Sequence, residues 1–463
     1  MTDSALLKST VVEGGYCVGC GACAAVPGSP VTMKMDEAGR LQARFDGVDE
    51  ARTSLRAVCP FSDLAVNENI IGEALFAKEG AQPDARVGWY RDVWAGYVSE
   101  GDFRKRGSSG GMGNWLAAEL LSSGEVDAVV HVRPDIDGRL FGFTISRSTV
   151  ELKAGSKSRY YPVEMSSVFK EMRDNPGRYA LVGVPCFIKA ARLMARNDAV
   201  IDQGLRYTIS LVCGHLKSDG FAKMFGWQLG ILPNRLRAID FRVKNDDGRA
   251  NQYSITASGE DAAGQDVTRT RQNKDFFGYL WSHGLFKYRA CDYCDDVFGE
   301  TADVTVGDAW LPGLVDDPRG TNVVVSRNPR ISALIEAGLA SGRLTLDTIT
   351  ADAAAKSQDA GLRHRRQGLA VRLARARRKG RWAPPKRVQP EAAKEIEYRQ
   401  RLVYETRETL SERSHDAFSK AVKTGSFETF KAEVSPLMKF HDFINQHKTL
   451  KSMVRAIVKP KRG

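Results

Sequence analysis

Eight cysteines constrain the fold of this 463-residue chain more than any other feature of its sequence. Three of them, Cys17, Cys20 and Cys23, form a C-x2-C-x2-C run in a glycine-rich stretch. The chain shows no secretory signal and no apolar run near the roughly 18 residues that a membrane-spanning helix needs. We therefore expect a cytoplasmic protein in a reducing compartment, where clustered cysteines indicate metal ligands rather than disulfides.

The spacing of the first three cysteines is typical of an iron–sulfur cubane, in which each thiolate binds a different corner. In bacterial two-cluster ferredoxins the next ligand is a cysteine that is followed by proline. Here the local position is Pro27, and the Cys-Pro pair occurs instead at Cys59. The run and Cys59 therefore predict one cluster in a ferredoxin-like motif that has lost its second cluster. A four-cysteine zinc site is the alternative, since thiolates alone do not select the metal.

The other four cysteines predict a second site. Cys186 and Cys213 each follow a predicted strand, at the position where α/β sheets place ligands. Cys291 and Cys294 form a C-x2-C pair, which can hold a metal from two sides. A lone cysteine at a strand end is commonly a small buried apolar residue, so the pair carries most of this prediction.

Between residues 81 and 350, short apolar runs alternate with amphipathic stretches, a pattern that predicts an α/β (α+β) fold. We expect a ferredoxin-like iron–sulfur segment at 1–80, a central mixed α/β domain at 81–350 and a helical extension at 351–463. A solvated hairpin is expected at 251–270. The expected strands are Val93–Val98, Ala128–Val132, Phe141–Ser146, Tyr179–Val184, Thr208–Val212, Ala238–Val243, Val304–Val306 and Asn322–Val325. The expected helices are Trp115–Leu121, Phe187–Ala195, Ala353–Arg378 and Glu391–Val422.

Across roughly residues 15–345 the chain resembles the coenzyme F420 hydrogenase/dehydrogenase beta-subunit family, and 7-hydroxymethyl chlorophyll a reductases are similar as well. The resemblance rests on short motifs in the family's order. They are the Cys17/Cys20/Cys23 run with Cys59-Pro60, Ser108-Ser109-Gly110-Gly111, Gly155-Ser156-Lys157-Ser158, Val184-Pro185-Cys186, Val212-Cys213-Gly214-His215, the Cys291/Cys294 pair and the run from Asp303 to Trp310.

The resemblance implies two [4Fe-4S] clusters and FAD, and electron exchange between a low-potential carrier (ferredoxin or F420-like) and an organic substrate. The basic C-terminal extension resembles that of bacterial members found with exopolysaccharide-synthesis genes, which points away from F420 itself. Two other functions remain open. A non-catalytic electron-transfer subunit would hold clusters without flavin, and a zinc-stabilised interaction protein would hold zinc without iron or sulfide.

The loop from Ser108 through Ser109 and Gly110 to Gly111 precedes a predicted helix. Backbone N–H groups and hydroxyls at a helix N-terminus form an anion site, here suited to the FAD pyrophosphate. A capped helix after a flexible turn is the simpler explanation. No G-x-G-x-x-G fingerprint follows a first strand, so the flavin site is not expected to be Rossmann-like.

Four further side chains are weaker candidates. Lys157 could place a positive charge beside the flavin, and Asp308 could bond a ring or ribose group. His215 and His283 are the histidines nearest the cysteine motifs and could donate a proton to a substrate. Each of the four is also readily explained as a surface or structural residue.

Positive charge is concentrated in the C-terminal extension. Residues 361–463 contain 26 Lys/Arg and 10 Asp/Glu, a net charge of +16, whereas the rest of the chain carries −4. Between residues 363 and 387 there is no acidic residue, and Leu369 and Val371 are interleaved. This pattern predicts either peripheral contact with the anionic inner face of a membrane or packing on the acidic body. No module for specific nucleic-acid binding is visible.

Overall fold

The computed structural model describes residues 2–136 and 138–446. In these ranges the largest sheet has eight strands in the order β15-β5-β14-β13-β9-β8-β6-β7. Its central strands β6, β8, β9 and β13 are parallel. β14 is antiparallel to both β13 and β5, so β5 runs in the direction of the central strands. The strands are β5 (Asp92–Val98), β6 (Ala128–Ile136), β7 (Arg139–Ser146), β8 (Tyr179–Gly183), β9 (Leu205–Leu211), β13 (Val304–Asp308), β14 (Asn322–Ser326) and β15 (Leu344–Thr348).

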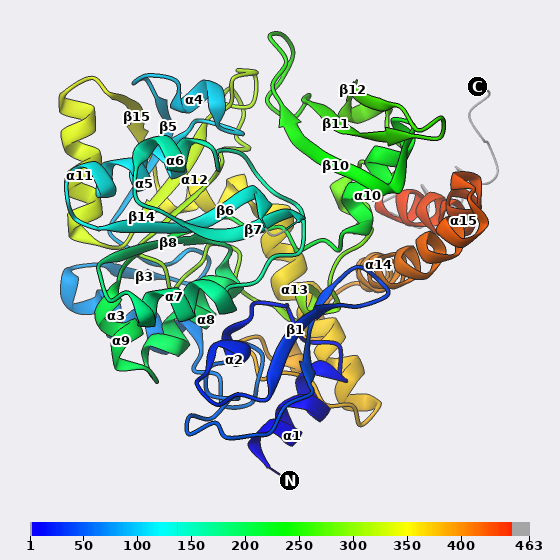
Figure 1. Cartoon of the computed structure of the whole chain (residues 1–463), viewed down its shortest axis with the longest axis horizontal. Helices are drawn as coiled ribbons and strands as arrows, with labels where there is room; N and C mark the ends of the chain where they lie inside the picture. The colour runs from blue at the N-terminus through cyan, green and yellow to red at the C-terminus, as the bar shows by residue number, and fades with distance from the viewer. Residues whose placement is uncertain (1, 137, 447–463) are drawn as a thin grey trace.

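Helices cover both faces of this sheet (Figure 1). α5 (Met112–Ser122) and α11 (Pro329–Ala340) pack on one face. α7 (Ser166–Asp174) and α8 (Pro185–Ala195) pack on the other, where α12 (Ala351–Ser357) also lies. Successive strand residues point to opposite faces, so neighbouring valines in β6 join different helix layers. Strands buried on both faces explain why the sequence shows continuous apolar runs.

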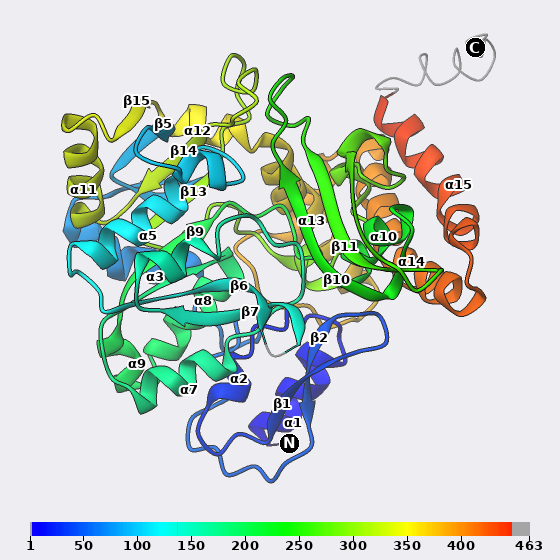
Figure 2. The ribbon, with the colours of Figure 1, turned by 45° about the horizontal axis from the view of Figure 1, so that its top comes forward.

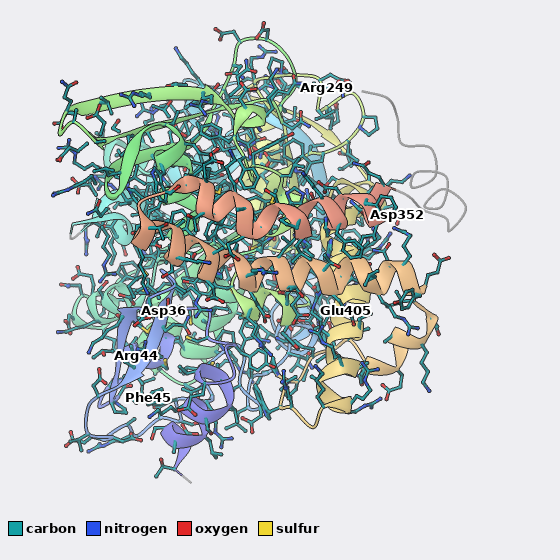
Figure 3. The ribbon with its side chains drawn as sticks, turned by 90° about the vertical axis from the view of Figure 1, so that its right-hand side faces the viewer. Asp36, Arg44, Phe45, Arg249, Asp352 and Glu405 are labelled. Carbon is teal, nitrogen blue, oxygen red and sulfur yellow. The ribbon has the colours of Figure 1, made fainter. Side chains whose placement is uncertain are left out.

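A second sheet is built from β10 (Ile231–Val243), β11 (Ser254–Asp261) and β12 (Asp266–Gln272). The last two strands form the hairpin that the sequence predicts at 251–270. Beneath the sheet lies α10 (Gly220–Gln228), followed by the helical hairpin α14 (Tyr398–Thr424) and α15 (Phe427–Gln446) (Figures 2 and 3). Phenylalanines from β10, α10, α14 and α15 form much of its core, together with Ile255 and Ala257 of β11.

The N-terminal segment packs against α7 and α8. It begins helically, at α1 (Asp3–Leu7) and a π-helix (Lys8–Val12), although the sequence predicts no helix there. Its cysteine loop is followed by the hairpin of β1 (Val31–Met35) and β2 (Leu41–Phe45). The remaining elements are α2 (Ala22–Ala25), α3 (Glu68–Phe76), β3 (Gln82–Asp84), β4 (Gly88–Tyr90), α4 (Phe103–Arg106), α6 (Thr149–Lys153), α9 (Ala199–Gly204), α13 (Asp359–Arg378) and the short helices η2 (Ala77–Glu79), η3 (Asn273–Asp275), η4 (Trp281–His283), η5 (Arg289–Tyr293) and η6 (Pro390–Glu395).

The mixed α/β fold with a helical C-terminal part agrees with the sequence prediction. The predicted helix at 353–378 is in fact two helices, α12 and α13, because the backbone departs from helical geometry at Gln358. Within the described ranges, no helix is long and apolar enough to cross a membrane.

Candidate functional site

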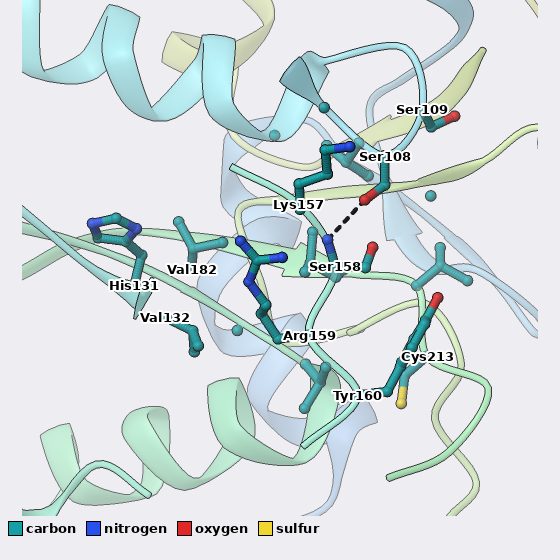
Figure 4. Close-up of a pocket in the computed structure, with 18 of the residues that line it drawn as sticks. Ser108, Ser109, His131, Val132, Lys157, Ser158, Arg159, Tyr160, Val182 and Cys213 are labelled. Atoms are coloured by element: carbon teal, nitrogen blue, oxygen red, sulfur yellow. Dashed lines mark hydrogen bonds between the residues drawn. The ribbon is translucent and has the colours of Figure 1, made fainter. Parts of the chain in front are cut away.

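A cavity of about 270 Å³ opens at the carboxyl ends of β8, β9 and β13. The strand-end residues Val182, Leu211 and Val306 line it, together with the loop between α4 and α5. The carboxyl ends of parallel strands are where open α/β sheets place their ligands. Cys213, which follows β9, also lies in its wall (Figure 4). This cavity is therefore the candidate ligand site.

The loop before α5 is fixed by its own hydrogen bonds. Ser108 Oγ accepts a 2.7 Å hydrogen bond from the backbone N–H of Ser158 (Figure 4). Ser109 Oγ donates to the carbonyl oxygen of Thr321 at 2.7 Å. Of the four predicted loop residues, all but Gly110 line the cavity. Gly110 instead approaches the backbone of the neighbouring strands, because a Cβ there would lie 2.7 Å from the carbonyl oxygen of Gly96.

Cations that the sequence prediction missed support this loop from behind. Arg242 donates to the carbonyl oxygen of Ser108 at 3.2 Å, and Lys244 donates to that of Ser109 at 2.7 Å. Burial, together with the nearby charges of Arg104, Lys157 and Arg242, lowers the pKa of Lys244 to about 7. These residues are far from the loop in sequence, so no local pattern identifies them. Their positive charge makes the loop a favourable place for an anion.

Lys157 and Asp308 both line the cavity, as expected of binding residues, but their charges already have protein partners. Lys157 Nζ lies 3.1 Å from Asp240 and donates to the carbonyl oxygen of Arg242 at 3.0 Å. Asp308 forms an ion pair with the buried Arg242 at 3.1 Å. Both side chains therefore shape the cavity wall as members of one charge network.

The opposite wall contains His131 and Arg159, which the sequence prediction did not select (Figure 4). His131 Nε2 lies 2.8 Å from Ser146 Oγ. Burial, together with the charge of Arg133, lowers the pKa of His131 to about 4, so its imidazole is neutral at neutral pH. The position of His131 on a central strand is the one signal that could have identified it.

The two histidines predicted as proton donors lie in different places. His215 lines the cavity and stacks on Trp281, with ring centroids 4.3 Å apart. Neither of its ring nitrogens has a hydrogen-bond partner among the described residues. Burial, followed by the charge of Lys217, lowers its pKa well below the usual value. His283 is not among the lining residues, because its ring turns toward Asp442 of α15 at 2.8 Å.

The four cysteines of the first predicted set share one region. Burial, followed by the charge of Cys59, raises the pKa of the Cys20 thiol. Burial, followed by the charges of Cys20, Cys17 and Cys59, raises the pKa of Cys23. Cys59 therefore lies with the C-x2-C-x2-C run, although a hairpin separates them in sequence.

The second set also comes together. The pKa of the Cys186 thiol lies well above its usual value. Burial is the largest cause, followed by the charges of Cys213, Cys294 and Cys291. Cys20 of the first set has the same effect on Cys186, so the two sets are neighbours. The second set is therefore near both the first set, through Cys186, and the cavity, through Cys213.

The spacing of the sulfurs bears on the choice of metal. In the part of the chain that the structure describes, no three cysteine sulfurs lie within 4.8 Å of one another. One zinc ion at about 2.3 Å from four thiolates would hold the sulfurs about 3.8 Å apart. A cubane separates its thiolates further, because each binds a different iron. Each set offers four thiolates, which is the number of donors that an iron–sulfur cluster needs.

The C-terminal extension reaches the second cysteine set. Arg365 of α13 is only 3% exposed and donates to the carbonyl oxygens of Gly214 at 2.7 Å and Cys291 at 3.2 Å. Farther along α13, Arg372 donates to the carbonyl oxygen of Asp292 at 2.7 Å. Beyond the helix, Arg387 pairs with the buried Asp295 at 3.1 Å. Sequence reasoning treated these arginines as surface charge, whereas Arg365 and Arg372 are buried and Arg387 is mostly covered.

The apolar side of α13 is buried as well. Leu369 is fully buried in the main core and Val371 is 5% exposed. Contact of residues 363–387 with an anionic membrane stays a prediction. The alternative that the sequence left open, packing on the acidic body, is what the structure shows.

Comparison with known proteins identifies related domains. The family models for the N-terminal and C-terminal parts of the coenzyme F420 hydrogenase/dehydrogenase beta subunit match residues 93–170 and 177–352, respectively. Together the matches cover more than half of the chain and contain the cavity and the second cysteine set. A chain of the F420-reducing [NiFe] hydrogenase complex from Methanosarcina barkeri is 14% identical, with 65% of this chain and 96% of that chain covered and a TM-score of 0.48. No curated protein matches.

Proposed function

Because this chain belongs to the coenzyme F420 hydrogenase/dehydrogenase beta-subunit family, a family of redox proteins, we propose that it is an iron–sulfur flavoprotein oxidoreductase. It would hold two [4Fe-4S] clusters and FAD, and exchange electrons with a ferredoxin-like or F420-like carrier to reduce or oxidise an organic substrate. Such clusters carry single electrons, and a bound flavin exchanges them for the electron pairs of organic reactions.

One observation carries this proposal. Cys213 belongs to the second cysteine set and also lines the cavity. A molecule bound in the cavity would therefore contact the wall that holds one cluster ligand. In this assignment Cys17, Cys20, Cys23 and Cys59 hold the first cluster, and the second set holds the other. The ligands of the second cluster would be Cys186, Cys213, Cys291 and Cys294.

The flavin assignment rests on the loop before α5. Ser108, Ser109 and Gly111 line the cavity at the start of a helix, with Arg242 and Lys244 behind them. A helix N-terminus with fixed positive charge nearby favours a phosphate group. Lys157 and Asp308 would contact the bound flavin from the cavity wall, whereas Gly110 would act by allowing the loop to pack.

For proton handling we propose His215 alone. Its neutral ring faces the cavity beside Lys217, and neither nitrogen has a partner in the described residues. With its pKa lowered, the imidazole is a weak base that would accept a proton only from a stronger acid and would readily give it up to a substrate. His283 has no role in this cavity because it does not line it.

We propose three functional segments: an iron–sulfur segment at 1–80, a flavin- and cluster-binding domain at 81–350 and a C-terminal extension at 351–463. The extension's similarity to that of bacterial members found with exopolysaccharide-synthesis genes favours polysaccharide or cell-envelope metabolism as the setting. Contact with an anionic membrane would depend on exposed cations such as Arg377 and Arg378 alone, and low-salt liposome binding tests it.

The deciding experiment is anaerobic purification followed by measurement of iron, sulfide, zinc and flavin in one sample. Two clusters predict roughly eight iron and eight sulfide atoms per chain, with bound FAD. Intact clusters without flavin would favour the second candidate, an electron-transfer subunit of a larger complex. Zinc without iron or sulfide would contradict both redox functions and favour a zinc-stabilised interaction protein.

A further inference from the structure

Two buried histidines that are distant from each other in sequence, His283 and His441, lie side by side. His283 ends the short helix η4, and His441 lies in α15, the outer helix of the C-terminal hairpin (Figures 1 and 3). The side chains are 3% and 2% exposed, and the ring centroids are 5.7 Å apart. Asp442 follows His441 and brings a carboxylate to the same point.

The ligand atoms of these three residues are close enough for one ion. His283 Nε2 lies 2.8 Å from Asp442 Oδ1, and His441 Nδ1 lies 3.6 Å from the same oxygen. One ligand atom from each residue falls within 4.8 Å of the other two. Of the residues that the structure describes, no other set of three His, Cys, Asp or Glu side chains meets this criterion.

The hydrogen bonds of this group are incomplete. Both ring nitrogens of His441, and Nδ1 of His283, are buried without a partner among the described residues. Leaving a buried polar atom unpaired costs about 1–3 kcal/mol, so native proteins usually satisfy such atoms. A cation bound between the rings and the carboxylate would give His441 Nδ1 the partner that it lacks among the described residues.

We propose that His283, His441 and Asp442 bind one divalent transition-metal ion, with zinc as its most suitable occupant. Two imidazoles and a carboxylate are ligands that zinc accepts in tetrahedral sites with a fourth, non-protein position. This site has no sulfur ligand and so differs from the cysteine sets, because thiolates favour softer metal ions and iron–sulfur clusters.

The charges around the rings are compatible with this ligand set. Burial, followed by the charge of His283, lowers the pKa of His441 to about 4, so its lone pair is available at neutral pH. Asp442 contributes the negative charge. The charge of Arg407 opposes a cation here, and its guanidinium donates to the carbonyl oxygens of Ser282 at 2.7 Å and Trp281 at 3.2 Å. His364 of α13 also lies near His441, and burial lowers its pKa.

An ion at this point would tie the last described helix to the wall of the cavity. His283 is two residues from Trp281, which stacks on His215 and lines the cavity. The metal would therefore fix α15 against the turn that positions Trp281. This site stands independently of whatever occupies the cavity, because none of its three ligands lines it.

The experiment compares zinc retention by the anaerobically purified full chain and three variants. Each is incubated with zinc chloride, desalted and analysed for zinc and iron. Asp442→Asn is the primary variant, because this side chain is 38% exposed and its replacement should not prevent folding. His441→Gln removes a second ligand. His415→Gln is the matched control, since it removes a buried histidine that bonds Ser218 and Lys287 instead.

We expect the wild type and His415→Gln to retain about one more zinc ion per chain than Asp442→Asn and His441→Gln. Zinc should also raise the melting temperature of the first two proteins and not that of Asp442→Asn. Iron content should be the same in the wild type and Asp442→Asn, which separates this site from the clusters. Equal zinc retention by wild type and Asp442→Asn, or an equal thermal shift, would overturn the proposal.

Discussion

Arg365 of α13 donates a 2.7 Å hydrogen bond to the carbonyl oxygen of Gly214, the residue that follows Cys213. The same guanidinium bonds the carbonyl oxygen of Cys291 at 3.2 Å. Burial opposes its charge, but the thiols of Cys294, Cys213, Cys291 and Cys186 together raise its pKa. A residue of the C-terminal extension thus supplies a positive charge beside the second cysteine set.

Replacing Arg365 by Met should make the second cluster harder to reduce. A buried positive charge favours the more negative, reduced state, and its field is poorly screened. We expect the midpoint potential to fall by roughly 60 mV, which is a tenfold change in the equilibrium constant of a one-electron couple. An EPR-monitored redox titration measures it. Arg363→Met, a change on the same helix at a side chain that is 50% exposed, should leave the potential unchanged.

Ending the chain after residue 360 should remove more than a charged tail. Leu369 and Arg372 are buried against the body, and Arg365 bonds the second cysteine set. We expect a lower melting temperature and loss of up to half of the iron. A chain that ends at Gln446 keeps all of these contacts and is the control. A shorter chain with full iron and an unchanged melting temperature would contradict the structural role of the extension.

Gly113→Val should reduce bound flavin without unfolding the protein. Gly113 lines the cavity, and an added Cβ would meet only Leu211 Cδ2 at 3.8 Å, which is an ordinary contact. The branched side chain would occupy ligand space, whereas Gly113→Ala should have a smaller effect. Absorbance of released flavin and thermal melting measure the two quantities. Unchanged flavin in Gly113→Val would remove this helix end from the site.

Gly111→Ala should instead destabilise the fold. Gly111 has φ +90°, and an added Cβ would lie 2.8 Å from the backbone of Phe103. A residue forced into such a conformation costs of order 1–3 kcal/mol. Chemical denaturation should therefore show a lower free energy of unfolding for Gly111→Ala than for Gly113→Ala.

FAD affinity should fall as pH rises above about 7. Burial and neighbouring cations hold the pKa of Lys244 near 7 in the free protein, and a bound phosphate would raise it by favouring the ammonium form. The contribution of Lys244 to binding is therefore complete below pH 7 and lost as pH passes the raised pKa of the complex. Fluorescence titration from pH 6 to 9 tests this, and Lys244→Arg, which stays charged, should flatten the profile.

The sequence predicted seven of the eight strands of the largest sheet because these strands show apolar runs. The edge strand β15 was missed, since polar residues alternate with its two leucines. The first residues of β10 were missed, since this strand is irregular and partly exposed, with Pro233 and Arg235 near its start. The helix α10 was missed because glycine and aromatic residues obscure its period. Residues 447–463, part of the predicted extension, lie outside the described residues.

The cysteine sets and the cavity were predictable in part because their motifs are local. Charge pairs such as Arg242 with Asp308 join residues that are distant in sequence, so they carry no local pattern. The role of Arg365 was missed for the same reason. In composition, a buried arginine that bonds carbonyl oxygens cannot be told from a solvated one.

The position of α13 also constrains biogenesis. Translation delivers all eight cysteines before the helix that closes over the second set, and chains begin to fold from the N-terminus as they emerge. Tyr16 precedes Cys17 of the first set and donates a hydrogen bond to the carbonyl oxygen of Trp382. The C-terminal extension therefore contacts the regions of both cysteine sets. Any scaffold that delivers preassembled iron and sulfide therefore has its widest access to these thiols on the ribosome, before the last part of the polypeptide docks.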